Sequence, residues 1–104
     1  MILHDRVIVV TGGYRDGGGN VLPIVKHGPF PAEMRPLRSS ETLIQGGALM
    51  TAFYRLVIGR AGGSLLTYTG AIEWGGKRYA VQGDVEPHHV NGRLHHYEVT
   101  VKRG

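Results

Sequence analysis

The placement of glycine constrains this chain more than any other feature of its sequence. The 104 residues include 17 glycines, more than twice the average usage of roughly 7%. They show no collagen-like period and gather at a few places, with five of them between residues 12 and 20. Glycine adopts positive φ readily and is costly to order inside helices and strands. Such clusters therefore predict turns and mobile loops between short strands.

The segments between these clusters are typical of β-strands, because β-branched and apolar residues alternate or run together in them. We expect strands at residues 6–11, 21–27, 32–37, 50–58, 71–74, 77–85 and 93–103. The strand at 50–58 carries apolar residues on both of its faces, so we expect it to be covered on both sides. Pro23 lacks a backbone N–H and indicates an edge strand at 21–27.

Glycine, asparagine and proline mark the predicted turns and strand ends between these strands. Residues 75–76 are two glycines and residues 91–92 are Asn-Gly, and both pairs predict tight hairpin turns. Residues 27–31, with two prolines, and the Glu86-Pro87 pair predict strand ends. Residues 59–70 are expected to form a long loop.

One short helix is expected between two of these strands. Ser39 or Ser40 can cap its first turn, Glu41 is favourable near the positive helix end, and the glycines at 46–47 stop it. Together these elements predict a mainly β fold, a small β-barrel or sandwich of six to seven short strands with one short helix and long glycine-rich loops. We expect a single domain over residues 1–104. The inward face of the hairpin at 71–85 is predicted to comprise Ile72, Trp74, Tyr79, Val81 and Val85.

Composition excludes several classes of protein. The chain has no cysteine, so disulfides and thiolate chemistry are absent. Its longest aliphatic run, residues 7–10, is far below the roughly 20 residues that span a bilayer. The N-terminus becomes charged at Asp5 before a signal-peptide apolar region can form. We therefore expect a soluble, cytosolic product without membrane association.

The histidines raise the question of a metal site. Residues 88–89 and 95–96 are two His-His pairs. Adjacent strand residues point to opposite faces, so each pair can offer one ligand to a single site, and no carboxylate or thiolate partner is evident. We favour surface or structural histidines. The alternative is a histidine metalloenzyme that uses His88 and His95.

Other catalytic patterns are weaker still. The carboxylates Glu73, Asp84, Glu86 and Glu98 fall at strand positions that barrels ordinarily fill with solvent-facing charge. No serine lies in a nucleophile-elbow motif, and the glycines at 17–19 lack both phosphate-loop spacing and a following helix. We therefore expect no enzyme activity, no catalytic residues, no metal and no cofactor.

The net charge of +4 allows a second alternative, a small basic barrel that binds nucleic acid. Such a protein would combine basic charge with exposed aromatic rings on one sheet face. Tyr54, Tyr79 and Tyr97 instead alternate with aliphatic residues, which favours packing in the core. Basic charge can still face DNA phosphates without sequence preference.

Four stretches of the chain resemble a known family. In order they are PLRSSE at residues 36–41, YRLVI at 54–58, WGGKRYAVQGDVEPH at 74–88 and GRLHHYEVTV at 92–101. Together they resemble the head-to-tail stopper (head-closure) proteins of long-tailed (siphovirus) bacteriophages, in the version from actinobacterial phages. The resemblance covers most of the chain from residue 6 to residue 103.

The resemblance implies a virion structural protein at the head–tail interface, assembled in the host cytoplasm. Twelve copies would form a homo-oligomeric ring between the portal–adaptor connector and the tail terminator or tail tube. That ring would close the channel after packaging, let double-stranded DNA pass without sequence-specific binding, and offer the tail a docking surface. A monomer in solution is compatible with such assembly. The neighbouring neck components are alternatives, but adaptors are mainly helical and tail terminators are longer α/β chains.

The resemblance also implies a gate segment that projects into the channel between the predicted strand at 32–37 and the next one. The gate and oligomer-contact candidates are Arg38, Ser39, Ser40, Glu41, Thr42, Leu43, Ile44, Gln45, Gly46 and Gly47. The candidates for docking contacts made by loops are Tyr14, Arg15, Asp16 and Arg60.

Overall fold

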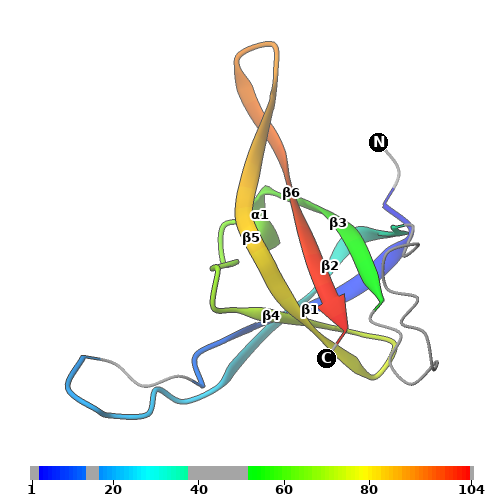
Figure 1. Cartoon of the computed structure of the whole chain (residues 1–104). Coiled ribbons are helices and arrows are strands. Elements are labelled where there is room, and N and C mark those ends of the chain that lie inside the picture. The colour runs from blue at the N-terminus through cyan, green and yellow to red at the C-terminus, as the bar shows by residue number, and fades with distance from the viewer. Residues whose placement is uncertain (1–2, 14–16, 38–51, 104) are drawn as a thin grey trace.

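The chain folds into one closed β-barrel, seen in a computed structural model that describes residues 3–13, 17–37 and 52–103 (Figure 1). Its elements are β1 (Asp5–Thr11), β2 (Val25–Pro36), β3 (Phe53–Gly59), α1 (Arg60–Gly63), β4 (Ala71–Trp74), β5 (Lys77–Val90) and β6 (Arg93–Arg103). The six strands close in the order β1-β2-β3-β6-β5-β4, and every neighbouring pair is antiparallel. The predicted small β-barrel is confirmed.

The barrel interior is filled by one apolar cluster that draws on every strand. Its fully buried members include Val7 and Val9 of β1, Leu56 of β3, Ile72 of β4 and Val99 of β6. These residues recur at every second position because successive strand residues face opposite sides. The core therefore follows directly from the alternation in the sequence.

Both faces of β3 are covered, as its sequence predicts. Leu56, Val57 and Ile58 are consecutive, and each is fully buried. Leu56 and Ile58 belong to the interior cluster, whereas Val57 points to the opposite side of the strand.

The inward face predicted for the β4–β5 hairpin is also confirmed. Ile72 pairs directly with Tyr79, and both are buried. Trp74 and Val85 are partly buried against the same core. The rings of Trp74, Tyr79 and Tyr54 meet edge-on or tilted, with centroids 5.4 to 6.0 Å apart.

The predicted break at residues 27–31 is wrong, because β2 runs through it. Between Phe30 and His27, β2 advances three residues while β1 advances two. This bulge takes up Gly28, at a φ of 113°, and Pro29, which follows a cis peptide bond. A bulge is a place where a strand tolerates a proline, because the residue without an N–H leaves the ladder.

The predicted strand end at Glu86-Pro87 is wrong for a related reason. β5 continues to Val90 after a register shift between Gln82 and Glu86, and Pro87 pairs with Tyr97 of β6. Among the described residues β4 pairs only with residues 77–80 of β5. Pro87 therefore lies in an edge strand, where a missing N–H costs no ladder bond on the open side.

The hairpin turns lie where the sequence places them. Gly75 and Gly76 have φ values of 59° and 77°, and Asn91 and Gly92 have values of 51° and 75°. Positive φ at both central residues is the geometry that two-residue hairpins require.

The described residues contain one helix, in a segment that the sequence indicates as a loop. α1 occupies the start of the segment 59–70 that the sequence indicates as a loop. The helix predicted from Ser39 or Ser40 lies outside the described residues.

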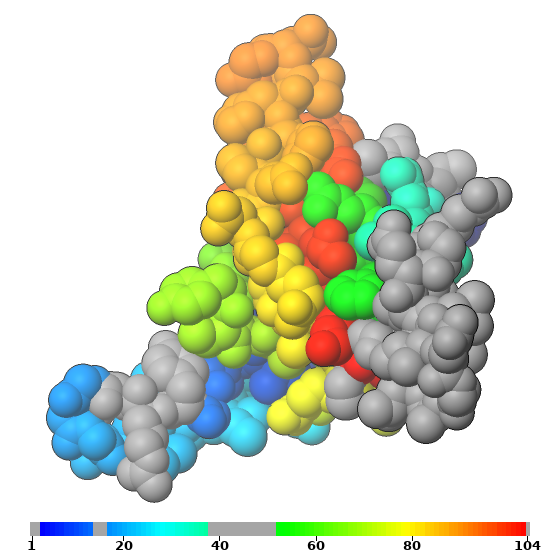
Figure 2. All heavy atoms as spheres, in the orientation of Figure 1, coloured from blue at the N-terminus to red at the C-terminus, as the bar shows by residue number. Residues whose placement is uncertain are grey.

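Two extensions leave the barrel in different directions (Figures 1 and 2). One, here called the arm, follows β1 and leads into β2; its described residues are 12–13 and 17–24. The other, here called the ribbon, is the outer part of the β5–β6 hairpin, residues 86–96. The radius of gyration is 14.8 Å, above the roughly 13 Å of a compact domain of this length. No helix among the described residues has the length and apolar character needed to cross a membrane.

Candidate functional site

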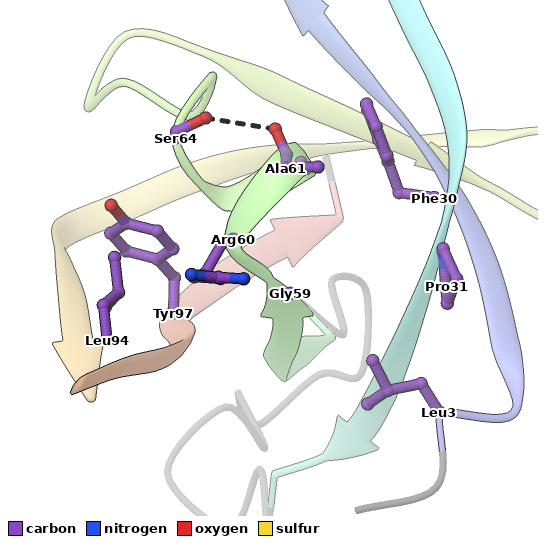
Figure 3. A pocket seen from close by; sticks show the side chains of 10 residues that line it. Leu3, Phe30, Pro31, Gly59, Arg60, Ala61, Ser64, Leu94 and Tyr97 are labelled. Atoms are coloured by element: carbon purple, nitrogen blue, oxygen red, sulfur yellow. Dashed lines mark hydrogen bonds between the residues drawn. The ribbon is translucent and has the colours of Figure 1, made fainter. Parts of the chain in front are cut away.

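A wide apolar groove of about 620 Å³ lies where α1 meets the barrel (Figure 3). Its lining residues are Leu3, Phe30, Pro31, Gly59, Arg60, Ala61, Gly62, Ser64, Leu94 and Tyr97. They come from β2, the end of β3, α1 and β6, and from residues just before β1 and just after α1, which are far apart in the sequence. We call this surface the α1 groove.

Two glycines allow α1 to form one wall of this groove. A Cβ at Gly63 would lie 2.1 Å from Cδ2 of Tyr97, and one at Gly62 would lie 2.8 Å from Cγ of Phe30. Only residues without a side chain let the helix backbone approach both rings so closely. The Ser64 hydroxyl donates a hydrogen bond to the Ala61 carbonyl and closes the turn.

Sequence reasoning missed this helix because glycine is a poor helix former. The sequence feature that could have indicated the helix is the Gly62-Gly63 pair, but such a pair is equally typical of a loop. What decides between the two is the contact with Phe30 and Tyr97, residues distant in sequence.

Arg60, one of the residues predicted to make docking contacts, lies at the edge of the α1 groove. It is the one charged residue among those lining the groove, and it makes no ion pair with another described residue. It also lines a smaller adjoining depression of about 320 Å³ together with Val90, Arg93, Leu94 and His95. The apolar groove thus continues onto the ribbon, and the basic residues Arg60 and Arg93 line this continuation together with Leu94.

The structure does not describe the other residues predicted to make docking or gate contacts. Tyr14, Arg15 and Asp16, and the gate candidates Arg38, Ser39, Ser40, Glu41, Thr42, Leu43, Ile44, Gln45, Gly46 and Gly47, lie outside the described residues. The described residues on either side of the gate segment are close together, because the Leu37 N–H donates to the Phe53 carbonyl at 2.9 Å. The segment therefore leaves and rejoins the barrel at one place, between β2 and β3.

The arm presents apolar side chains to solvent. Val21 is 61% exposed and Ile24 is 53% exposed, and Val25 at the start of β2 is also exposed. Where the arm leaves the barrel its two sides are joined, since the Gly13 N–H donates to the Leu22 carbonyl at 2.9 Å. Apolar residues exposed side by side on an extension are typical of a surface that another chain covers.

The outer face of the barrel carries a cluster of histidine and charged residues. His88 pairs directly with His96 across the β5–β6 ladder, and Glu86 pairs with Glu98 two residues along. The His96 Nε2 and the Glu98 Oε2 are 2.8 Å apart. The expectation that the histidines lack a carboxylate partner is therefore wrong, because the register of β5 and β6 brings Glu98 next to His88 and His96.

Three basic groups act on Glu98. The hydrogen bond with His96 is the main reason that the pKa of Glu98 lies below its ordinary value, and Arg55 and His88 act in the same direction. The Arg55 Nε is 3.5 Å from the Glu98 Oε1, and its Nη2 is 2.9 Å from the Glu86 Oε1. His95, the other residue named for a metalloenzyme, contributes differently, since its Nδ1 meets the Nδ1 of His96 at 2.9 Å.

The three tyrosines considered for nucleic-acid stacking all pack with the core. Tyr79 is 3% exposed, and burial raises the pKa of its phenol. Tyr54 and Tyr97 are partly buried against the same cluster. Their rings are therefore not available as an outer stacking platform.

The sequence was compared with protein-family models and with curated proteins, and no family model and no curated protein matches it.

Proposed function

We propose that this chain is a non-enzymatic structural subunit, a head-to-tail stopper of a long-tailed phage. The observation that carries the proposal is that one chain leaves both an apolar arm and an apolar groove uncovered. A small barrel gains nothing from either surface while it is alone. Both become useful when copies assemble.

Contact between two different surfaces of the same chain is heterologous, and repeated heterologous contacts close into a ring when the rotation per copy allows it. In the proposed assembly the arm of one copy, with Val21 and Ile24, packs into the α1 groove of the next. The apolar lining of the groove matches the apolar arm. Ordering of the glycine-rich arm then occurs at assembly, where the new contacts offset its entropy cost.

The proposed place of this ring is the virion neck, between the portal–adaptor connector and the tail terminator or tail tube. Twelve copies are expected there by the resemblance. The net charge of +4 is modest, which suits a channel wall that lets double-stranded DNA pass without gripping it. The segment that starts and ends between β2 and β3 is the proposed gate.

The test is electron microscopy of particles made when this gene is silenced in its phage. We expect DNA-leaking heads that accumulate beside separate, finished tails, and rescue when the gene is supplied in trans. Intact infectious particles without the protein would contradict the proposal. An excess of unfilled heads would contradict it too, because a stopper acts after packaging.

The small nucleic-acid-binding barrel remains the competing class, and the core positions of its candidate tyrosines weigh against it. A binding assay with DNA at low and at moderate salt separates the two. A nucleic-acid binder predicts affinity that falls steeply with salt and depends on exposed aromatic residues. A stopper predicts weak binding that no single aromatic substitution changes.

A further inference from the structure

We propose that His88, His96 and Glu98 form a binding site for a borderline divalent cation such as Zn²⁺. The site lies on the outer face of the barrel, at the base of the ribbon. This inference is independent of the proposed stopper role.

Strand register creates the site. His88 and His96 are directly opposite each other on β5 and β6, and Glu98 follows His96 by two residues, so all three side chains share one face. One ligand atom from each lies within 4.8 Å of the other two. Directly paired strand residues are held about 4.5–5.5 Å apart at Cβ, so two of the ligands approach each other without help from loops.

The distances between the ligand atoms require only small adjustments, a widening between Glu98 and His96 and a contraction between Glu98 and His88. In a tetrahedral zinc site, ligands about 2.0–2.2 Å from the ion lie roughly 3.4 Å from each other. The Glu98 Oε2 is already 2.8 Å from His96 Nε2 and 3.7 Å from His88 Nδ1. The His88 side chain is 39% exposed, so it is free to turn toward the ion. Its ring is now stacked on that of His96, with centroids 4.9 Å apart.

Outer partners already orient two of the three ligands. Arg55 holds the Oε1 of Glu98 and leaves Oε2 directed at the imidazoles. The Nδ1 of His96 is engaged by His95, which leaves Nε2 as the ligand atom. Hydrogen bonds of this kind to the far side of a ligand fix its orientation and are worth roughly 10–100-fold in metal affinity.

The donor set selects the class of cation. Two imidazole nitrogens and one carboxylate oxygen suit Zn²⁺ and its neighbours, whereas Mg²⁺ and Ca²⁺ prefer oxygen alone. Three protein ligands leave a fourth position to water. The ion would join β5 to β6 where the ribbon leaves the barrel, so its expected effect is to stiffen the ribbon.

The test is a calorimetric titration of chelator-treated full-length protein with Zn²⁺ at neutral pH. The variants are His88→Ala and Glu98→Gln, with His89→Ala as the matched control, because His89 is exposed and points to the other face. Circular dichroism establishes that each variant is folded. Amide hydrogen exchange of β5 and β6, with and without Zn²⁺, gives a second readout.

We expect one equivalent of Zn²⁺ on the wild type and on His89→Ala. His88→Ala and Glu98→Gln should each weaken binding by about 100-fold or more, since a ligand contributes at least as much as an outer partner. Exchange in β5 and β6 should slow with Zn²⁺, and Mg²⁺ should have no effect. Absence of saturable Zn²⁺ binding, or binding that survives both substitutions unchanged, would overturn the proposal.

Discussion

Gly63 lies so close to the ring of Tyr97 that a Cβ on it would be 2.1 Å from the ring atom Cδ2. The contact joins α1 to β6. The same ring of Tyr97 lines the α1 groove.

Gly63→Ala is therefore expected to destabilise the protein. Forcing a methyl group into a packed site costs about 1–3 kcal/mol in the free energy of unfolding, and the obstacle here is an aromatic ring that is itself packed on the core. The measurement is urea denaturation, monitored through the fluorescence of Trp74, the only tryptophan in the sequence. Gly59→Ala is the control, because nothing lies within 4 Å of a Cβ there. Equal stability of the two variants would mean that α1 is not held against Tyr97.

Gly12→Ala is expected to disturb the base of the arm. Gly12 has a φ of 82°, and a Cβ on it would lie 2.0 Å from the carbonyl oxygen of Pro23. The backbone must shift there, because the obstacle is not a flexible side chain. Gly17→Ala is the matched control in the same arm, since a Cβ on Gly17 meets nothing within 4 Å. Amide exchange should rise at residues 12–13, 21–22 and 24–25 in Gly12→Ala alone, and an unchanged pattern would refute the account of the arm.

Stability should fall in acid partly through Glu73. Its carboxylate accepts a hydrogen bond from Arg78 and lies 3.2 Å from the Lys26 Nζ. The Arg78 bond, and then Lys26, place the pKa of Glu73 below the ordinary value of 4.5. A lowered pKa in the folded state contributes stability above the unfolded-state pKa, and that contribution is lost as pH falls through the folded-state value.

Glu73→Gln should therefore lower stability at neutral pH slightly and flatten its decline below about pH 4.5. Urea midpoints measured from neutral to acidic pH test this expectation. Asp84→Asn is the control, because Asp84 is exposed and makes no ion pair with other described residues. A decline in Glu73→Gln as steep as in the wild type would contradict the assignment.

Val21→Ser should impair assembly without affecting folding. Val21 is 61% exposed, and surface substitutions of this kind usually change stability by no more than about 0.5 kcal/mol. Val21→Ile is the matched control, since it keeps the arm apolar. Complementation of the silenced phage should fail with Val21→Ser and succeed with Val21→Ile. Full complementation by Val21→Ser would remove the arm from the proposed contact.

Local sequence was a good guide wherever one strand face or one turn decided the outcome. The alternation of Tyr97, Val99 and Val101 in β6 and the Asn91-Gly92 turn are set by residues next to each other in the chain, and both are confirmed. β2 and β5 were harder to predict. Pro29 and Pro87 indicate strand ends by themselves, and only the bulge against β1 and the open side of β5 make them acceptable.

The candidate site was less predictable, because it too depends on contacts between residues that are distant in the sequence. The sequence indicated Arg60, but the groove beside it depends on Phe30, Leu94 and Tyr97 meeting around α1. The histidine cluster depends on which residue of β5 is opposite which residue of β6. A register shift between Gln82 and Glu86 sets that pairing. The spacing of residues in the sequence does not predict such a shift.

Closure of the barrel has a consequence for the order of folding. β1 is joined to β4 only through residues 8–10 and 71–73, so the seam connects the beginning of the chain to its last third. Contacts between distant parts of a chain form late, because loop-closure entropy opposes them until other structure is in place. On the ribosome, β1 and β2 can pair early, but the seam must wait until β4 has emerged. The nascent chain is thus expected to hold an open sheet for most of its synthesis and to close it near the end.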